Sequence, residues 1–202
     1  TISGGDGIRS GGGVTISGNT VNATGGSGED GGYGICSFDR VAISGGTVTA
    51  NGGDSSSRKG ASGISSSSGV TVSGGTVNAN GGNGDYNGGS GISSFDRVAV
   101  SGGTVTANGG SGNFSGGDGI SSSGIDLSGS LELTAKAGKG TQSNGKALSQ
   151  NGSELDLDTI KDKLGPGAKV TATDANGKTK QVSIPRPVEP EESSSSSDGG
   201  SA

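Results

Sequence analysis

The chain has 202 residues and a formal net charge of −5; 47 residues are Gly and only 25% are hydrophobic. So few apolar residues exclude one wide globular core, whereas a narrow core extended along one axis needs fewer of them per turn of chain. The single cysteine, Cys36, excludes an intramolecular disulfide. The sequence has no basic stripe for nucleic acid or an anionic membrane surface, and no apolar run long enough for membrane insertion.

The chain contains no Met and opens on Thr1-Ile2-Ser3-Gly4-Gly5, which looks like the tail of an earlier repeat. We therefore expect a segment of a longer protein whose signal peptide lies outside it. We also expect the open first coil to be able to stack on further repeats or on another chain, because an uncovered strand edge invites pairing.

A repeat of about 28 residues then dominates the sequence. Four nearly identical segments and a degenerate fifth begin at Val14, Val41, Val70, Val98 and Ile125. A Gly-Ile marker has the same spacing, at Ile8, Ile35, Ile64, Ile92 and Ile120, with Leu148 as a sixth equivalent. A fixed period of this length is typical of solenoids.

Each repeat contains three short runs in which apolar and polar residues alternate, which predicts three strands with one buried face each. In the first repeat they hold Ile8, then Val14 and Ile16, then Val21 and Ala23. Gly between the second and third runs permits the positive φ of a sharp corner. We therefore predict an all-β, parallel β-helix (β-solenoid) of about six coils over residues 1–148. A meander of hairpins would have two strands per repeat, so three runs favour the coil.

The composition changes after the repeats, which predicts a C-terminal cap over residues 149–184. Asp158 is placed to N-cap a short helix over 159–164, which Gly165 and Pro166 would end. A β-hairpin is predicted over 168–184, because Asn-Gly marks its turn. From Pro185 the Pro-, Glu- and Ser-rich sequence predicts a disordered linker over 185–202.

The segment after each Gly-Gly pair varies most, and the repeat places these segments in one column of loops. They hold three of the five aromatic residues together with carboxylates and amides. Flat apolar rings and orienting hydrogen-bonding groups are what a sugar site requires. The candidate ligand-binding residues are Glu29, Asp30, Tyr33, Asp85, Tyr86, Asn87, Asn113 and Phe114. The alternative is that these loops are simply solvated.

The run that begins Asp6-Gly7-Ile8 and continues to Val-Thr-Ile-Ser-Gly resembles a family of secreted bacterial proteins described as carbohydrate-binding domain-containing. The resemblance covers residues 1–148. It implies a right-handed parallel β-helix, an extracellular or cell-surface location, and binding of acidic plant polysaccharides such as polygalacturonate. It also implies calcium, with aspartates before the Gly-Ile marker as ligands. In this sequence Asp6 and Asp118 match that position.

Catalysis is not expected, because the chain has no His and its one Cys has no partner. The predicted function is therefore a non-catalytic, extracellular polysaccharide-binding module. One alternative is a structural or adhesin rod of a bacterial surface protein, without a small-molecule ligand. Another is ice binding through outward ranks of Thr and Asn, such as Thr47 and Thr49, on the third strand of each coil.

Overall fold

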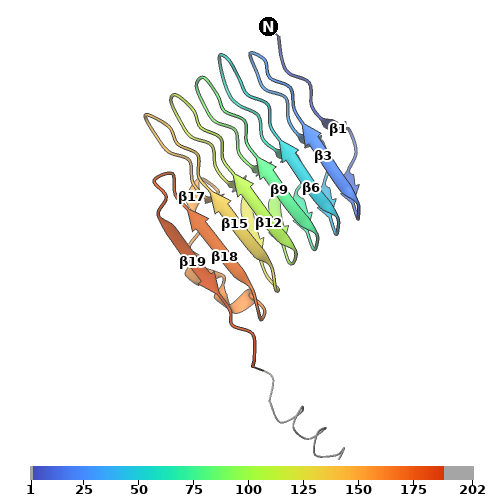
Figure 1. Cartoon of the computed structure of the whole chain (residues 1–202), viewed down its shortest axis with the longest axis vertical. Helices are drawn as coiled ribbons and strands as arrows, with labels where there is room; N and C mark the ends of the chain where they lie inside the picture. The colour runs from blue at the N-terminus through green and yellow to red at the C-terminus, as the bar shows by residue number, and fades with distance from the viewer. Residues whose placement is uncertain (1, 189–202) are drawn as a thin grey trace, which may run out of the picture.

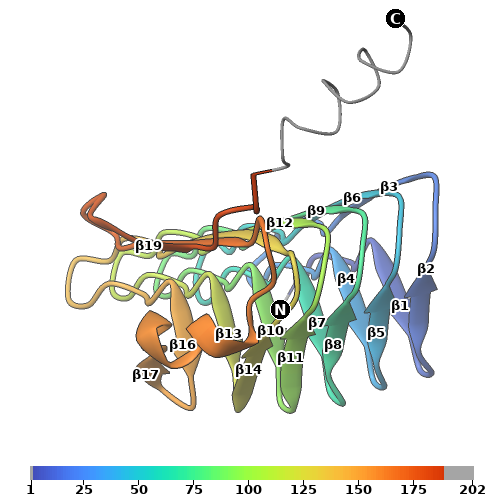
Figure 2. The same ribbon diagram turned by 90° about the horizontal axis from the view of Figure 1, so that it is seen from below.

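The computed structural model describes residues 2–188, which form a β-solenoid with three parallel sheets (Figures 1 and 2). The first sheet contains β1 (Ile8–Ser10), β4 (Ile35–Ser37), β7 (Ile64–Ser66), β10 (Ile92–Ser94), β13 (Ile120–Ser122), β16 (Leu148–Gln150) and the antiparallel β17 (Ser153–Glu154). The second contains β2 (Val14–Ile16), β5 (Val41–Ile43), β8 (Val70–Val72), β11 (Arg97–Val100) and β14 (Gly124–Leu127). The third contains β3 (Thr20–Thr24), β6 (Thr47–Asn51), β9 (Thr76–Asn80), β12 (Thr104–Asn108), β15 (Glu132–Lys136), β18 (Lys169–Thr173) and the antiparallel β19 (Thr179–Ser183).

One strand from each sheet makes one coil, so β1–β3 form coil 1 and β13–β15 form coil 5. Within residues 2–188 there are five complete coils and a sixth, built on β16 and β18, without a strand in the second sheet. The predicted three-stranded parallel solenoid is confirmed.

The core consists of several columns of identical or similar apolar side chains, and each coil contributes one side chain to each column. In the first sheet Ile35, Ile64, Ile92 and Ile120 lie in register and are buried. In the third sheet Val stacks on Val, as at Val77 and Val105, and Ala stacks on Ala in a separate column. The stack is thin, which is why a low apolar content suffices. In coil 1 Ile8, Val14 and Val21 are only partly buried.

The corner between the second and third strands uses a left-handed backbone conformation, as predicted from its glycines. Gly46, Gly75 and Gly103 have φ of 85°, 82° and 77°. In coil 1 the corner residue is Asn19, with φ of 64°. Asn tolerates this region better than most residues with a side chain.

Side-chain amides add a second ladder at the end of the third strand. The Asn80 Nδ2 donates to Asn51 Oδ1 over 2.8 Å, and the Asn108 Nδ2 donates to Asn80 Oδ1 over the same distance. Asn80 therefore donates to one neighbouring coil and accepts from the other. This ladder fixes the vertical spacing of the coils at the point where the loop column begins.

The cap differs from prediction in its helix. The short helix expected over 159–164 is present as two 3₁₀ turns, η1 (Leu157–Thr159) and η2 (Lys161–Lys163). It begins earlier than expected, and its N-cap is Asp156, whose side chain accepts from the Asp158 N–H. The reason is packing: Leu157, Ile160 and Leu164 are buried against the open end of the core, and short turns bring all three to it. The predicted hairpin is present as β18 and β19.

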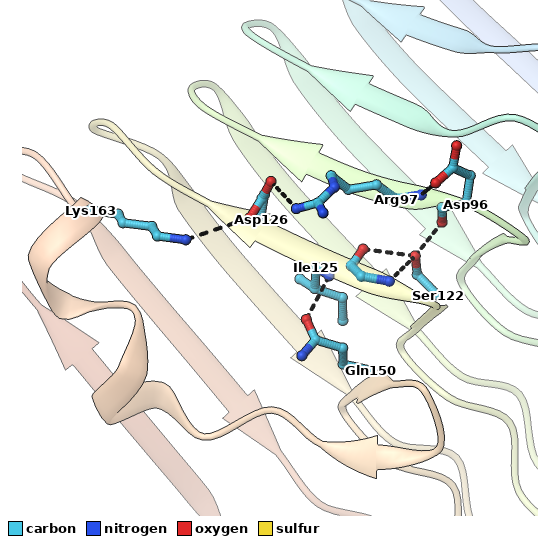
Figure 3. A network of polar contacts seen from close by, with 8 residues as sticks. Asp96, Arg97, Ser122, Ile125, Asp126, Gln150 and Lys163 are labelled. Carbon is cyan, nitrogen blue, oxygen red and sulfur yellow. Dashed lines mark hydrogen bonds and ion pairs between the residues drawn. The ribbon is translucent and has the colours of Figure 1, made fainter.

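Polar side chains complete the termination of the sheets. The two Glu154 carboxylate oxygens accept from the Ala147 and Leu148 N–H groups at 3.2 and 2.7 Å, where a further coil would supply carbonyls. In the second sheet Gln150 Oε1 accepts from the Ile125 N–H at 2.8 Å (Figure 3). Beside it, Asp126 pairs with Arg97 and with Lys163 of the cap (Figure 3).

Of the predicted linker over 185–202, residues 185–188 are exposed and without regular structure. The remainder of that prediction lies outside the described residues.

Candidate functional site

The variable segments form a column of loops along one edge of the solenoid, beyond the arrowheads of the third-sheet strands in Figure 1. Parallel bridges join each loop to the next. One line of bridges runs through Gly28, Ser55, Gly84, Gly112 and Gly140, and a second runs through Lys59, Asn87, Ser115 and Ser143. The predicted column is therefore an ordered, hydrogen-bonded wall, since each loop is fixed by its neighbours.

The base of this wall consists of glycine backbone. Gly82 N donates to Ala61 O at 2.8 Å, Gly89 N to Gly82 O at 2.8 Å, and Gly110 N to Gly89 O at 2.8 Å, so one relay of hydrogen bonds climbs through the coils. A Cβ built on Gly82 would lie 2.1 Å from the Gly53 carbonyl oxygen. Most glycines of the repeat thus serve the close approach of backbones and not the corners.

The outer part of the loop wall, which we call the crest, carries six of the eight predicted ligand-binding residues. They are Glu29, Asp30, Asp85, Tyr86, Asn113 and Phe114. Tyr86 and Phe114 stack with ring centroids 4.6 Å apart and planes 4° from parallel. Because the rings cover one another, they offer solvent mainly their edges and outer faces, although 51% of Tyr86 and 41% of Phe114 is exposed. Asn113 Nδ2 donates to Asp85 Oδ1 at 3.1 Å.

The other acidic residues of the crest are neutralised locally. Arg58 approaches Glu29 at 3.9 Å and Asp30 at 3.4 Å. These pairs are solvent-exposed, so each contributes little to stability. The side chains of the crest therefore stack, hydrogen-bond or form ion pairs with one another.

A groove lies beside this wall, over the outer face of the first sheet, and the sequence alone did not predict it. One hollow of about 410 Å³ extends from Asp30 and Tyr33 past Lys59 to Phe95. A second of about 180 Å³ continues from Lys59 and Asn87 to Asp118. Lys59 and Ser93 line both hollows, so the two form one groove over coils 2 to 5.

The floor of the groove is made of small polar side chains. Ser65, Ser93 and Ser121 occupy the central, outward position of β7, β10 and β13, in register with one another. Ser62 and Ser90 lie just before these strands and also line it. Phe95, 86% exposed, stands at the corner opposite the loop wall. The serines of the floor recur in the sequence as Gly-Ile-Ser-Ser. They line a groove only because the loop wall stands beside them, and the sequence alone does not show this.

Tyr33 lies at the end of the groove nearest coil 1. Its backbone N–H donates to Asp6 Oδ1 at 2.8 Å. Burial raises the pKa of the Tyr33 phenol above its usual value, and the neighbouring Cys36 and Asp6 add to that shift. Burial also raises the pKa of the Cys36 thiol, so this thiol stays protonated and weakly nucleophilic at neutral pH.

The calcium ligands implied by the resemblance do not come together. Asp6 binds the Tyr33 N–H and pairs with Arg9 at 2.9 Å, while Asp118 Oδ1 accepts from the Lys146 N–H at 2.7 Å. The two lie in coils 1 and 5, roughly 19 Å apart at about 4.8 Å per coil. Residues 2–188 contain no group of three or more Asp, Glu, His or Cys side chains that could hold a metal ion. Calcium prefers six to eight oxygen ligands, so these aspartates do not fit it and act as caps for backbone N–H groups.

The outward ranks of the third sheet are regular over four coils only. Thr20, Thr47, Thr76 and Thr104 lie in register, and the column then continues with Glu132 and Lys169. In the second rank Asn22 and Asn78 alternate with threonines. The charged residues and amides interrupt the threonine lattice on which the ice-binding alternative depends.

A further hollow, of about 600 Å³, lies in the cap between residues 154–158 and β19. Its walls include Glu154 and Leu157, which close the solenoid, and we assign it to the cap.

No model of a known protein family, no curated protein and no solved structure matches this chain. In the described part of the chain, no helix is long and apolar enough to cross a membrane.

Proposed function

We propose that this protein is a non-catalytic, extracellular polysaccharide-binding module and that the groove holds the polysaccharide. The observation that carries the proposal is the groove itself, which combines a floor of serine hydroxyls with Tyr33 at one end and the exposed Phe95 at one side. Hydroxyls and amides exchange hydrogen bonds with sugar hydroxyls, and aromatic faces pack against sugar rings. The proposed site therefore lies in the groove at the base of the loop wall and not at the crest. Of the eight ligand-binding residues predicted from the sequence, the groove includes Asp30, Tyr33 and Asn87.

The first test is binding to a panel of soluble polysaccharides that includes polygalacturonate, with calcium and with a chelator. We expect saturable binding to one class, unchanged by the chelator because Asp6 and Asp118 are four coils apart. The double variant Tyr33→Ala, Phe95→Ala should weaken that binding by roughly tenfold or more, since aromatic contacts of this kind contribute about 1 kcal/mol each beyond their area.

The matched control is the double variant Tyr86→Ala, Phe114→Ala at the crest, which should retain affinity within about threefold. Circular dichroism and urea unfolding of both variants separate lost binding from lost folding. If the crest variant loses binding and the groove variant keeps it, the site is at the crest. If no polysaccharide binds, the structural rod becomes the better description.

A substitution at Lys59 tests whether the ligand is negatively charged. Among residues 2–188 Lys59 is the one basic side chain lining the two hollows, and we expect it to meet a carboxylate of an acidic chain such as polygalacturonate. Lys59→Gln should lower affinity for polygalacturonate by roughly three- to tenfold at low salt, and the difference should shrink as salt screens the charge. Lys139→Gln, in a loop of the same wall, is the control. Equal affinities for wild type and Lys59→Gln would contradict an acidic ligand.

A further inference from the structure

We infer that the groove binds an internal stretch of an unbranched polysaccharide, laid along the axis of the solenoid with one sugar unit per coil. This inference rests on the proposed function and adds the direction, register and minimum length of the ligand. It follows from how the groove is built and not from its volume.

The lining of the groove is three parallel columns of equivalent residues. Ser65, Ser93 and Ser121 form one column, in register. Ser62, Ser90 and Asp118 form a second, each two residues before the Gly-Ile marker of its coil. Lys59, Asn87 and Ser115 form a third, joined by bridges between neighbouring loops. Every column runs across the strands, so a polar residue recurs about every 4.8 Å along the axis in each column, and in the first column it is always Ser.

A ligand gains most from such a surface if it repeats along the same direction with a similar spacing. An extended polysaccharide does so, because each unit presents a ring and hydroxyls at a spacing comparable to that between strands. A monosaccharide can reach the groups of only one coil. A single neutral hydrogen bond contributes little after desolvation, so affinity must accumulate from repeated contacts.

The columns also continue beyond the second hollow. Ser143 follows Ser115 and Lys146 follows Asp118, and both are exposed, whereas Ser149, which follows Ser121, is buried. A chain that occupies coils 2 to 5 can therefore extend past them along Ser143 and Lys146, beside the loop wall. This favours recognition of internal stretches of a chain over recognition of chain ends.

The experiment uses oligogalacturonides of two to eight units as probes, with xylan-derived oligomers of the same lengths beside them, measured by calorimetry on the whole chain. Affinity for the class that binds should rise by roughly two- to tenfold per added unit up to about four units and then level off. A fluorophore on the reducing end of the longest oligomer should leave its affinity unchanged. Affinity that is the same for two and eight units, or lost with the end label, would overturn the inference while leaving the proposed function in place.

A variant in the middle column supplies the second readout. Ser93 lines both hollows, so Ser93→Leu should divide the groove and abolish the gain in affinity beyond two units, with weak binding of the shortest oligomers retained. Thr71→Leu, at the corresponding outward position of β8 on the second sheet, is the matched control and should leave the length dependence unchanged. An unchanged length dependence in Ser93→Leu would place the chain elsewhere. Failure of every oligomer and of every polysaccharide in the panel would overturn both proposals.

Discussion

Replacing Gly82 by Ala is expected to destabilise the protein by roughly 3 kcal/mol or more, although it adds only one methyl group. The new Cβ would lie 2.1 Å from the Gly53 carbonyl oxygen and 2.6 Å from its carbon, both of them backbone atoms. Neither atom can move away alone, since Gly53 N donates to Gly32 O and Ala61 N donates to Gly53 O in the same relay. Relief of the clash would therefore require separation of coils throughout the wall.

Urea unfolding followed by circular dichroism measures this effect. The control is Gly12→Ala, at a glycine whose added Cβ would meet nothing within 4 Å. That substitution should change the free energy of unfolding by no more than about 0.5 kcal/mol, as most surface substitutions do. A Gly82→Ala variant that fails to fold agrees with the expectation, whereas equal midpoints for the two variants would show that the glycine wall is more plastic than its packing implies.

The glycines also show where sequence reasoning succeeded and where it stopped. The Ser-Gly-Gly corners could be predicted because a positive φ is a local property, and Gly46, Gly75 and Gly103 have it. The glycines at the base of the loop wall have no such local signal. Their role is to let backbones from different coils touch, which depends on the register between residues about 28 apart.

The same reasoning explains the outcome at the candidate site. The repeat placed the variable segments after each Gly-Gly pair in one column, so the loop column and its aromatic residues were predicted. The contact between Tyr86 and Phe114 was not predicted, although the two residues occupy equivalent positions of adjacent coils and the register of the coils brings their rings together. The groove was missed because its floor is serine, a residue that is unremarkable in any one strand and becomes a feature only beside the loop wall.

The helix of the cap differs in its start and type for another reason. Asp158 and Gly165-Pro166 are genuine local signals for a helix between them. The segment must also deliver Leu157, Ile160 and Leu164 to the exposed end of the core, and all three are buried there. Tertiary packing therefore outweighed the local preference and produced two short 3₁₀ turns.

The second large effect is expected from substitutions in the stacked apolar core. The loss in the free energy of unfolding should depend on the coil in which the substitution lies. Ile92→Ala is expected to cost about 3–4 kcal/mol, because it removes a fully buried side chain and leaves a cavity between Ile64 and Ile120 that the paired strands prevent from closing. Ile8→Ala makes the same chemical change at the equivalent position of coil 1, where the side chain is only partly buried. Its cost should be about 1–2 kcal/mol, in proportion to the apolar area lost.

Equilibrium urea unfolding of both variants tests this difference, and the slope of the transition carries further information. In a solenoid each coil is stabilised chiefly by its neighbours, so a defect in coil 4 interrupts the stack, whereas a defect in coil 1 only frays its end. We therefore expect Ile92→Ala to lower the midpoint markedly and, if the two halves then unfold separately, to reduce the apparent slope. Equal costs for the two substitutions would mean that coil 1 is covered as fully as coil 4.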